Sequence, residues 1–180
     1  MLADPQLKIA DLRAHLDALT PQARLAECVA LTAALQKRLW EMTSGEPATG
    51  CTLLSDGDGS TVYAGRNSLR LFTHFEKCFT RLGPSTVGYN RHQLSWLIGP
   101  GYFTVEPDSG GQLRFDYERV PPKSPPGWPA VTTNAGAFSR PVYGHLSDRV
   151  AWVAPGVLIG SAYRLGQPLD SYFVLVRVPG

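Results

Sequence analysis

The sequence predicts an α+β fold in which N-terminal helices precede a curled antiparallel β-sheet or β-barrel of about eight strands. Apolar residues recur every three or four positions before Pro84 and alternate after it, which indicates a change from helix to strand. The alternation is clearest in Gln112–Glu118 and Ser171–Val178, and turns rich in glycine and proline separate such segments. Because 180 residues suffice for one well-buried core, we expect a single domain over residues 1–180.

Two helices are predicted in an N-terminal helical part, residues 1–46. The first covers Pro5–Leu19. The second begins at Pro21, because Thr20 supplies a capping hydroxyl and proline fits the first helical position. Apolar residues at helical spacing extend this second helix to about Thr43.

A third helix is predicted over residues 68–82, between a capping Asn67 and a terminating Gly83. Its apolar positions form one broad face, made of Leu69, Phe72, Phe75, Phe79 and Leu82. We expect this face to pack against the sheet that follows.

A hairpin is predicted before that helix, with strands Cys51–Leu54 and Thr61–Ala64 joined by Ser-Asp-Gly-Asp-Gly-Ser. The acidic turn also suggests calcium binding. However, a calcium-binding loop that begins at Asp56 needs glycine at its sixth position and glutamate at its twelfth. Here these positions hold Thr61 and Asn67. The turn interpretation is therefore favoured.

Strands at short spacing make up most of the remaining chain. They are expected near Thr86–Asn90, His92–Ile98, Tyr102–Glu106, Gln112–Arg119, Arg140–Gly144, Arg149–Val153, Val157–Tyr163 and Tyr172–Val178. Sequential antiparallel strands favour a sheet that curls, and closure into a barrel would remove exposed edge strands.

The segment Val120–Gly136 interrupts this pattern with Pro-Pro-Lys-Ser-Pro-Pro-Gly-Trp-Pro. Prolines lack the N–H donors that a central strand needs, so no regular structure is expected here. A polyproline ligand for another domain is one interpretation. A strap packed across the sheet by a partly buried Trp128 is favoured, because the segment lies inside the predicted domain.

The bulk composition limits the classes of function. The formal net charge is only +2 and the basic residues are scattered, so nucleic-acid binding is not expected. Three widely spaced cysteines indicate neither a disulfide framework nor a zinc site. The sequence has no apolar leader and no apolar run of about 20 residues. We therefore expect a cytoplasmic protein without a membrane span.

The C-terminal region resembles a known type of barrel. The stretches that carry the resemblance are Val142–Asp148, Leu158–Gly160 and Tyr172–Arg177. They are similar to the end of lipocalin-like barrels, particularly the plastid lipid-associated (fibrillin) and related bacterial calycin-like families. The resemblance implies a closed or nearly closed barrel with an apolar interior. It also implies that Arg177 stacks on a tryptophan at the closed end.

Aromatic residues on the predicted strands are the expected wall of a ligand pocket. The wall is predicted to contain Val87, Tyr89, Trp96, Phe103, Phe115, Tyr117, Trp152 and Phe173. Arg177 shares a face with Phe173 in the last strand, so its guanidinium needs a carboxylate, backbone carbonyls or a ligand anion. A buried Tyr117 hydroxyl likewise needs a partner in the protein or in a ligand.

Histidines are the candidates for acid–base chemistry. His92 and His145 could each exchange a proton near neutral pH, and Asp148 could orient His145. Together with His74 they could also bind a metal, but their spacing does not require one. No metal or other cofactor is therefore expected.

The predicted function is binding of an apolar or amphipathic small molecule inside a lipocalin-like barrel. The alternative is an isomerase, cyclase or dehydratase without a redox cofactor. Such an enzyme would use the same pocket, with histidine or aspartate as acid–base and tyrosine or arginine stabilising an oxyanion. Whether the protein is an enzyme stays open at this point.

Overall fold

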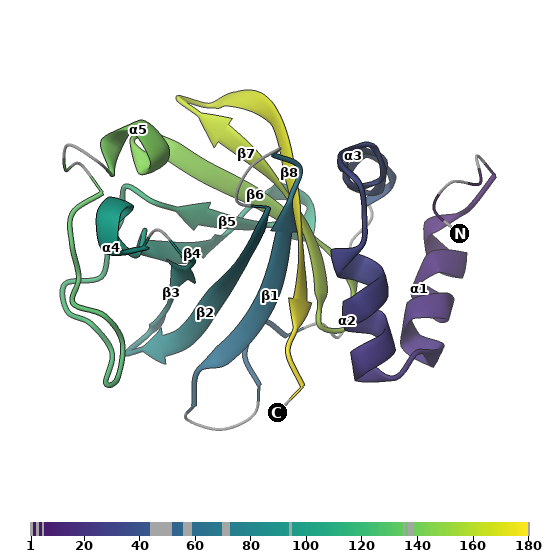
Figure 1. The fold of residues 1–180 in the computed structure, drawn as a ribbon, viewed down its shortest axis with the longest axis horizontal. Coiled ribbons are helices and arrows are strands. Elements are labelled where there is room, and N and C mark those ends of the chain that lie inside the picture. Colours follow the sequence, from purple (N-terminus) through teal and green to yellow (C-terminus); the bar gives the residue numbers. More distant parts are fainter. Residues whose placement is uncertain are drawn as a thin grey trace.

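A computed structural model describes residues 2, 4, 6–43, 52–55, 59–69, 73–93, 95–134, 136 and 139–179, except for the Trp96 side chain. N-terminal helices precede a closed antiparallel barrel of eight strands, which confirms the predicted fold class (Figure 1). At this coarse level the barrel also agrees with the C-terminal resemblance. None of the helices described is long and apolar enough to cross a membrane.

Three helices cover one side of the barrel. They are α1 (Ile9–Ala18), α2 (Pro21–Val29) and α3 (Ala33–Thr43). Thr20 caps α2 as predicted, with its hydroxyl accepting a hydrogen bond from the Ala23 N–H at 3.2 Å. A single helix was predicted from Pro21 to Thr43, but the chain forms two, with a break between Val29 and Ala33. The Thr32 hydroxyl accepts a hydrogen bond from the Leu35 N–H at 3.4 Å and caps the start of α3.

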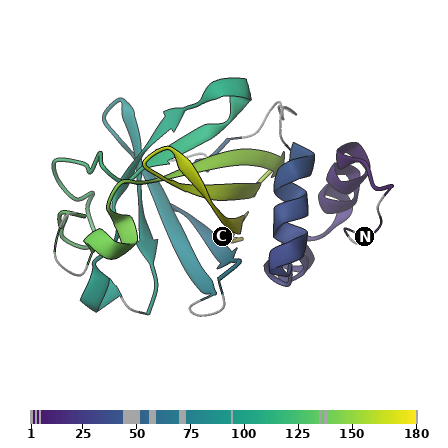
Figure 2. The same cartoon turned by 90° about the horizontal axis from the view of Figure 1, so that it is seen from above.

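The eight strands follow one another around the barrel in chain order, and β1 pairs with β8 to close it. The strands are β1 (Thr61–Asn67), β2 (His74–Leu82), β3 (Ser85–Arg91), β4 (Phe103–Pro107), β5 (Leu113–Asp116), β6 (Leu146–Ala154), β7 (Val157–Arg164) and β8 (Gln167–Arg177). Two one-turn helices, α4 (Ser95–Ile98) and α5 (Arg140–Tyr143), lie on the side of the barrel away from α1–α3 (Figure 2).

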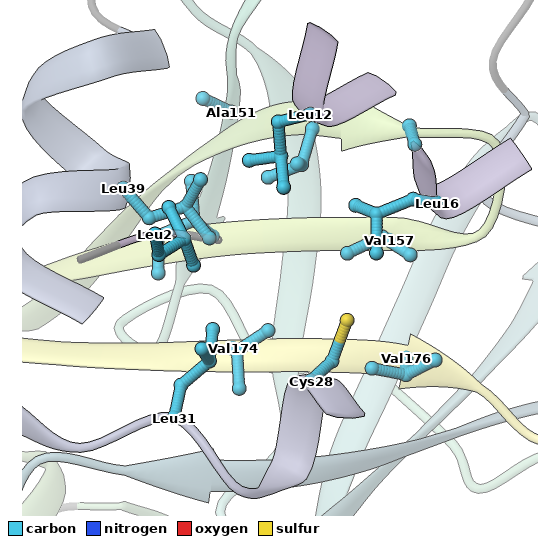
Figure 3. Close-up of a cluster of buried hydrophobic side chains, with 13 residues drawn as sticks. Leu2, Leu12, Leu16, Cys28, Leu31, Leu39, Ala151, Val157, Val174 and Val176 are labelled. Carbon is cyan, nitrogen blue, oxygen red and sulfur yellow. The ribbon is translucent and has the colours of Figure 1, made fainter. Parts of the chain in front are cut away.

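The outer face of β6, β7 and β8 carries the first apolar core, which α1–α3 cover. Leu12, Leu16, Cys28 and Leu39 of the helices pack over valines and alanines of the strands, such as Val174 (Figure 3). Within these strands, residues 150–154, 157–161 and 173–176 are therefore buried on both faces, which explains why these stretches are almost continuously apolar.

The barrel interior holds a second, aromatic core. Its buried members are Tyr63, Phe79, Phe103, Phe115, Tyr117, Tyr143, Val150, Trp152, Leu158, Phe173 and Leu175. Glycines on neighbouring strands make room for the rings. A Cβ atom on Gly160 would lie 2.2 Å from the ring of its cross-strand partner Phe173. The interior is therefore filled by interlocking aromatic side chains.

The predicted helix over residues 68–82 is wrong, because His74–Leu82 forms strand β2. Phe75 and Phe79 are four positions apart, a spacing that suits both a helix and one face of a strand. The residue between them on that face is Lys77, which hid the alternation. Residues 70–72 of the predicted helix lie outside the described part.

Three predicted strands are also wrong. Thr52–Leu54 forms no strand, and the following turn residues 56–58 lie outside the described part. His92–Ile98 contains α4 instead, because the Ser95 hydroxyl bonds back to the backbone of His92. Arg140–Gly144 contains α5, in which Pro141 lies in the first turn and lacks a ladder donor.

The proline-rich segment 120–136 carries no helix or strand in its described residues, as predicted. Trp128 is half-buried on the outside of the barrel, where its ring lies 4.7 Å from that of Tyr89 and 6.1 Å from that of Tyr102. Its indole N–H donates to the Ser60 hydroxyl at 2.8 Å. The strap is therefore fixed to the outer surface by aromatic packing.

Candidate functional site

A cavity of about 190 Å³ lies at the end of the barrel next to α5. It is smaller than the roughly 300–1,000 Å³ of pockets for drug-sized ligands, so it suits a small molecule. Its wall combines the end of β5, the strap and α5, through residues Tyr117, Glu118, Val120, Thr133, Asn134, Arg140, Tyr143, Gly144 and His145.

Two stacked tyrosines form the aromatic wall of the cavity. The rings of Tyr117 and Tyr143 are 5.5 Å apart and nearly parallel, with 11° between their planes. Gly101 has φ +55°, and a Cβ there would lie 2.4 Å from the Tyr143 ring, so only glycine lets this ring approach so closely. The Tyr143 hydroxyl lies 3.0 Å from Nε2 of His92. Burial raises the pKa of the Tyr143 phenol, so it is protonated at neutral pH.

Polar side chains form the rest of the wall. Asn134 donates hydrogen bonds to the backbone carbonyls of Tyr102 at 2.8 Å and Tyr117 at 2.7 Å, which ties the strap to the barrel. His145 Nδ1 lies 2.7 Å from the Glu118 carboxylate. The Arg140 guanidinium is exposed and has neither an ion pair nor a hydrogen bond within the described ranges.

Behind Tyr117 lies a buried polar network centred on Lys77. The Lys77 ammonium donates to Tyr117 Oη at 2.5 Å, Asn90 Oδ1 at 2.7 Å and Asp148 Oδ2 at 3.4 Å. The Tyr117 hydroxyl donates to Asp148 Oδ2 at 3.0 Å. All three ammonium protons therefore have acceptors, although the Lys77 side chain is only 3% exposed.

Aromatic rings surround the same ammonium group. Its nitrogen lies 4.7–5.6 Å from the ring centres of Phe75, Phe103, Phe115, Tyr117 and Phe173. Ring faces attract a cation and partly replace the water that Lys77 loses.

Burial changes the proton affinities in this network. It lowers the pKa of Lys77 and raises the pKa of Asp148, and in each case the opposite charge of the partner counteracts the effect. Burial also raises the pKa of Tyr117 well above its usual value, so this phenol stays protonated. Burial, followed by the charge of Lys77, lowers the pKa of His92.

The predicted pocket residues separate into three groups. Phe103, Phe115, Tyr117, Trp152 and Phe173 all belong to the interior core, where they pack against one another. The rings of Phe103 and Phe115, for example, stack 5.0 Å apart.

Tyr89 and Val87 lie elsewhere. Tyr89 belongs to the outer cluster under Trp128, and Val87 neighbours it on β3, two residues away and thus on the same face. Trp96 lies in α4, and its side chain is outside the described part.

Arg177 lies at the opposite end of the barrel from the cavity. Its guanidinium donates to the Thr52 carbonyl and to the Tyr63 hydroxyl, and it stacks over the Tyr63 ring at 5.6 Å. A tyrosine thus stands where the resemblance implied a tryptophan, and the partners include a backbone carbonyl. The partners that Arg177 needs are therefore supplied by the protein itself at the far end of the barrel.

The three candidate acid–base residues do not form one constellation. Asp148 bonds to Lys77 and Tyr117, whereas Glu118 takes the position beside His145. His92 contacts Tyr143. Within the described ranges no three His, Cys, Asp or Glu side chains are grouped to hold a metal ion.

The functional residues that sequence reasoning missed are Lys77, Asn90, Glu118, Asn134, Arg140 and Tyr143. The alternation Phe75–Lys77–Phe79 was the available signal for Lys77, because a lysine on an otherwise aromatic strand face needs buried partners. Asn134 and Tyr143 lie in irregular or one-turn segments, for which periodicity carries no information.

Comparison with models of known families, with curated proteins and with solved structures finds no match for this chain. The chemistry of the cavity wall is therefore the basis for assigning a function.

Proposed function

We propose that the protein binds a small amphipathic molecule, with a flat apolar part and an anionic group, in the cavity beside α5. The observation that carries this proposal is the pairing of an aromatic wall, Tyr117 and Tyr143, with an unpaired Arg140 guanidinium in one small cavity. Pockets of this kind combine apolar surface for affinity with a few polar groups for orientation.

The aromatic wall favours a planar ligand. The Tyr117–Tyr143 pair contributes aromatic atoms to the cavity wall, and Val120 adds an aliphatic side chain. Because these rings stack on each other and the residues are only 2% and 5% exposed, a planar ligand meets their edges, in the edge-to-face arrangement that aromatic rings also favour. The interior of the barrel, by contrast, is filled by its own aromatic side chains, so the proposed site is the end cavity.

The polar wall favours an anion. Arg140 is a permanently charged donor whose planar guanidinium matches a carboxylate. The neighbouring Glu118 carboxylate accepts a hydrogen bond from Nδ1 of His145 at 2.7 Å, so one of its oxygens is engaged within the protein.

Calorimetric titration with 2-naphthoate and its neutral analogue 2-naphthamide tests the proposal. We expect the wild type to bind both compounds saturably. Arg140→Gln should lower the affinity for 2-naphthoate by about tenfold and leave that for 2-naphthamide unchanged, because a charge-assisted hydrogen bond is lost. Arg81→Gln is the matched control, since Arg81 is an exposed arginine of β2 that does not line the cavity. The absence of saturable binding, or an equal loss with both arginine variants, would refute the proposal.

A further inference from the structure

We propose that His145 is a catalytic general base that moves a proton on a carbon acid held in the end cavity. The class of substrate is a small planar carbonyl compound with an acidic C–H bond. This inference rests on the proposed function, because the substrate occupies the same cavity. It favours the isomerase or dehydratase class over a simple carrier.

The side chain of His145 is arranged as a general base requires. Its Nδ1 donates a hydrogen bond to the Glu118 carboxylate at 2.7 Å, which orients the ring. The second ring nitrogen, Nε2, is then the atom that can accept a proton. No described residue forms a hydrogen bond with Nε2. Both His145 and Glu118 line the cavity in which we propose that the substrate binds.

The backbone of His145 is unusual. Its φ of +53° lies in the left-handed region, which residues other than glycine seldom adopt. The Leu165 N–H donates to the His145 carbonyl at 3.1 Å and holds this conformation in place. This backbone conformation and its hydrogen bond fix the position from which the His145 side chain extends.

The other two sequence candidates are less suitable as the base. Nε2 of His92 is engaged with the Tyr143 hydroxyl at 3.0 Å. Asp148 is bonded to Lys77 and Tyr117, and its side chain is only 5% exposed. Of these three residues, only His145 lines the cavity.

The chemical step is redox-neutral. Nε2 of His145 takes the proton from the carbon next to the carbonyl group. The C–H electron pair forms a C=C bond with the carbonyl carbon, and the π pair of the carbonyl bond moves to the oxygen. Glu118 stabilises the imidazolium, and Arg140 stabilises the oxyanion. When the imidazolium returns the proton to a different carbon, the product is an isomer. When a leaving group departs from the β-carbon, the product is an alkene and the leaving group takes the proton.

Base-catalysed ring opening of 5-nitrobenzisoxazole provides the test, because it needs only a general base in an apolar cavity. The base removes the ring C–H proton, the N–O bond breaks, and coloured 2-cyano-4-nitrophenolate forms. We expect saturable turnover that 2-naphthoate inhibits competitively. His145→Gly should reduce kcat at least about tenfold, since general bases contribute about 10²–10⁴-fold. Free imidazole should restore part of the rate.

Glu118 acts here as a positioning residue. Glu118→Gln should lower kcat while the inhibition constant of the neutral 2-naphthamide stays the same, which separates orientation of the base from damage to the cavity. His15→Gln is the matched control. His15 also pairs with a glutamate, Glu27 at 2.9 Å, but it lies on α1 and does not line the cavity. Its substitution should leave turnover unchanged.

The outcomes distinguish the two proposals. Normal 2-naphthoate binding with equal turnover in wild type and His145→Gly overturns the role of His145 and leaves the binding proposal intact. Loss of turnover that imidazole does not restore indicates a structural role and also overturns it. His145→Asn, which tolerates the left-handed conformation, provides a second folded variant if the glycine variant is unstable. Absence of 2-naphthoate binding to the wild type overturns both proposals.

Discussion

Lys77 places a primary ammonium group among five aromatic rings inside the barrel. Removing an ion from water costs several kcal/mol, and this cost is offset only where the ion has close partners. Asp148, Tyr117 and Asn90 provide them. The network thus fixes the orientation of Tyr117, which links the barrel interior to the cavity wall.

We therefore predict that Lys77→Met destabilises the fold by about 3–5 kcal/mol, because it leaves the Asp148 carboxylate buried without its cation. Chemical denaturation measures the free energy of unfolding. The double variant Lys77→Met/Asp148→Asn should be more stable than the single variant, since it removes the unpaired charge as well. Equal destabilisation in the single and double variants would contradict this account of the pair.

His92 makes stability depend on pH. Its pKa in the folded protein lies below the ordinary 6.5, mainly because of burial. The unfolded chain therefore binds a proton at a higher pH than the folded protein does. Between the two pKa values the unfolded state holds more protons, so stability decreases as the pH falls through 6.5.

His92→Gln should accordingly lose less stability than the wild type when the pH falls from 7.5 to 5.5. Denaturation curves at several pH values measure this difference. The contributions of the other histidines to the pH dependence are the same in both proteins and cancel in the comparison. Parallel stability profiles for the two proteins would show that His92 titrates alike in the folded and unfolded states.

Among the elements, β2 shows where sequence periodicity fails. Its interior face reads Phe75, Lys77, Phe79, and the lysine breaks the apolar alternation that identified the later strands β6–β8. Four-residue spacing of aromatics fits helix and strand alike, so only the pairing of β2 with β1 and β3 decides the outcome. Strands β6–β8 were predictable because they contain long stretches of apolar residues that no buried charge interrupts.

The site was less predictable than the barrel. Alternation identified Tyr117, and residue chemistry identified His145. However, the orienting carboxylate is Glu118, which comes from the chain after β5. Asn134 and Tyr143 also come from segments without periodicity. Such contacts depend on how distant segments meet, which a single sequence does not encode in its local pattern.

Close packing between β7 and β8 leads to another prediction. A Cβ on Gly160 would lie 2.2 Å from the Phe173 ring, so Gly160→Ala forces that ring to move. We expect a destabilisation of about 1–3 kcal/mol, measured by denaturation. Gly59→Ala is the control, since a Cβ there meets nothing within 4 Å and should change stability by less than about 0.5 kcal/mol. Similar effects at both positions would contradict this packing.

The whole molecule joins two cores through one sheet. The helices cover the outer face of β6–β8, whereas the strap and α5 lie at the end that contains the cavity (Figures 1 and 2). The layer of helices therefore stabilises the barrel without contributing to the cavity wall. The strap contributes Thr133 and Asn134 to that wall and is fixed by Trp128.

This division predicts different effects for two apolar truncations. Leu39→Ala removes a side chain that is 2% exposed and should cost about 2–5 kcal/mol, with unchanged affinity for 2-naphthoate. Trp128→Ala should also lower stability, by up to about 3 kcal/mol because the ring is only half-buried. It should in addition weaken 2-naphthoate binding severalfold, although Trp128 does not line the cavity.

Calorimetry well below both melting temperatures separates the two effects, because stability and affinity are then measured independently. In a variant whose only tryptophan is Trp128, emission should be blue-shifted from free indole in the folded state, since Tyr89 and Tyr102 pack against the ring. If Leu39→Ala weakens binding as much as Trp128→Ala does, then global stability, and not the anchored strap, determines the shape of the cavity.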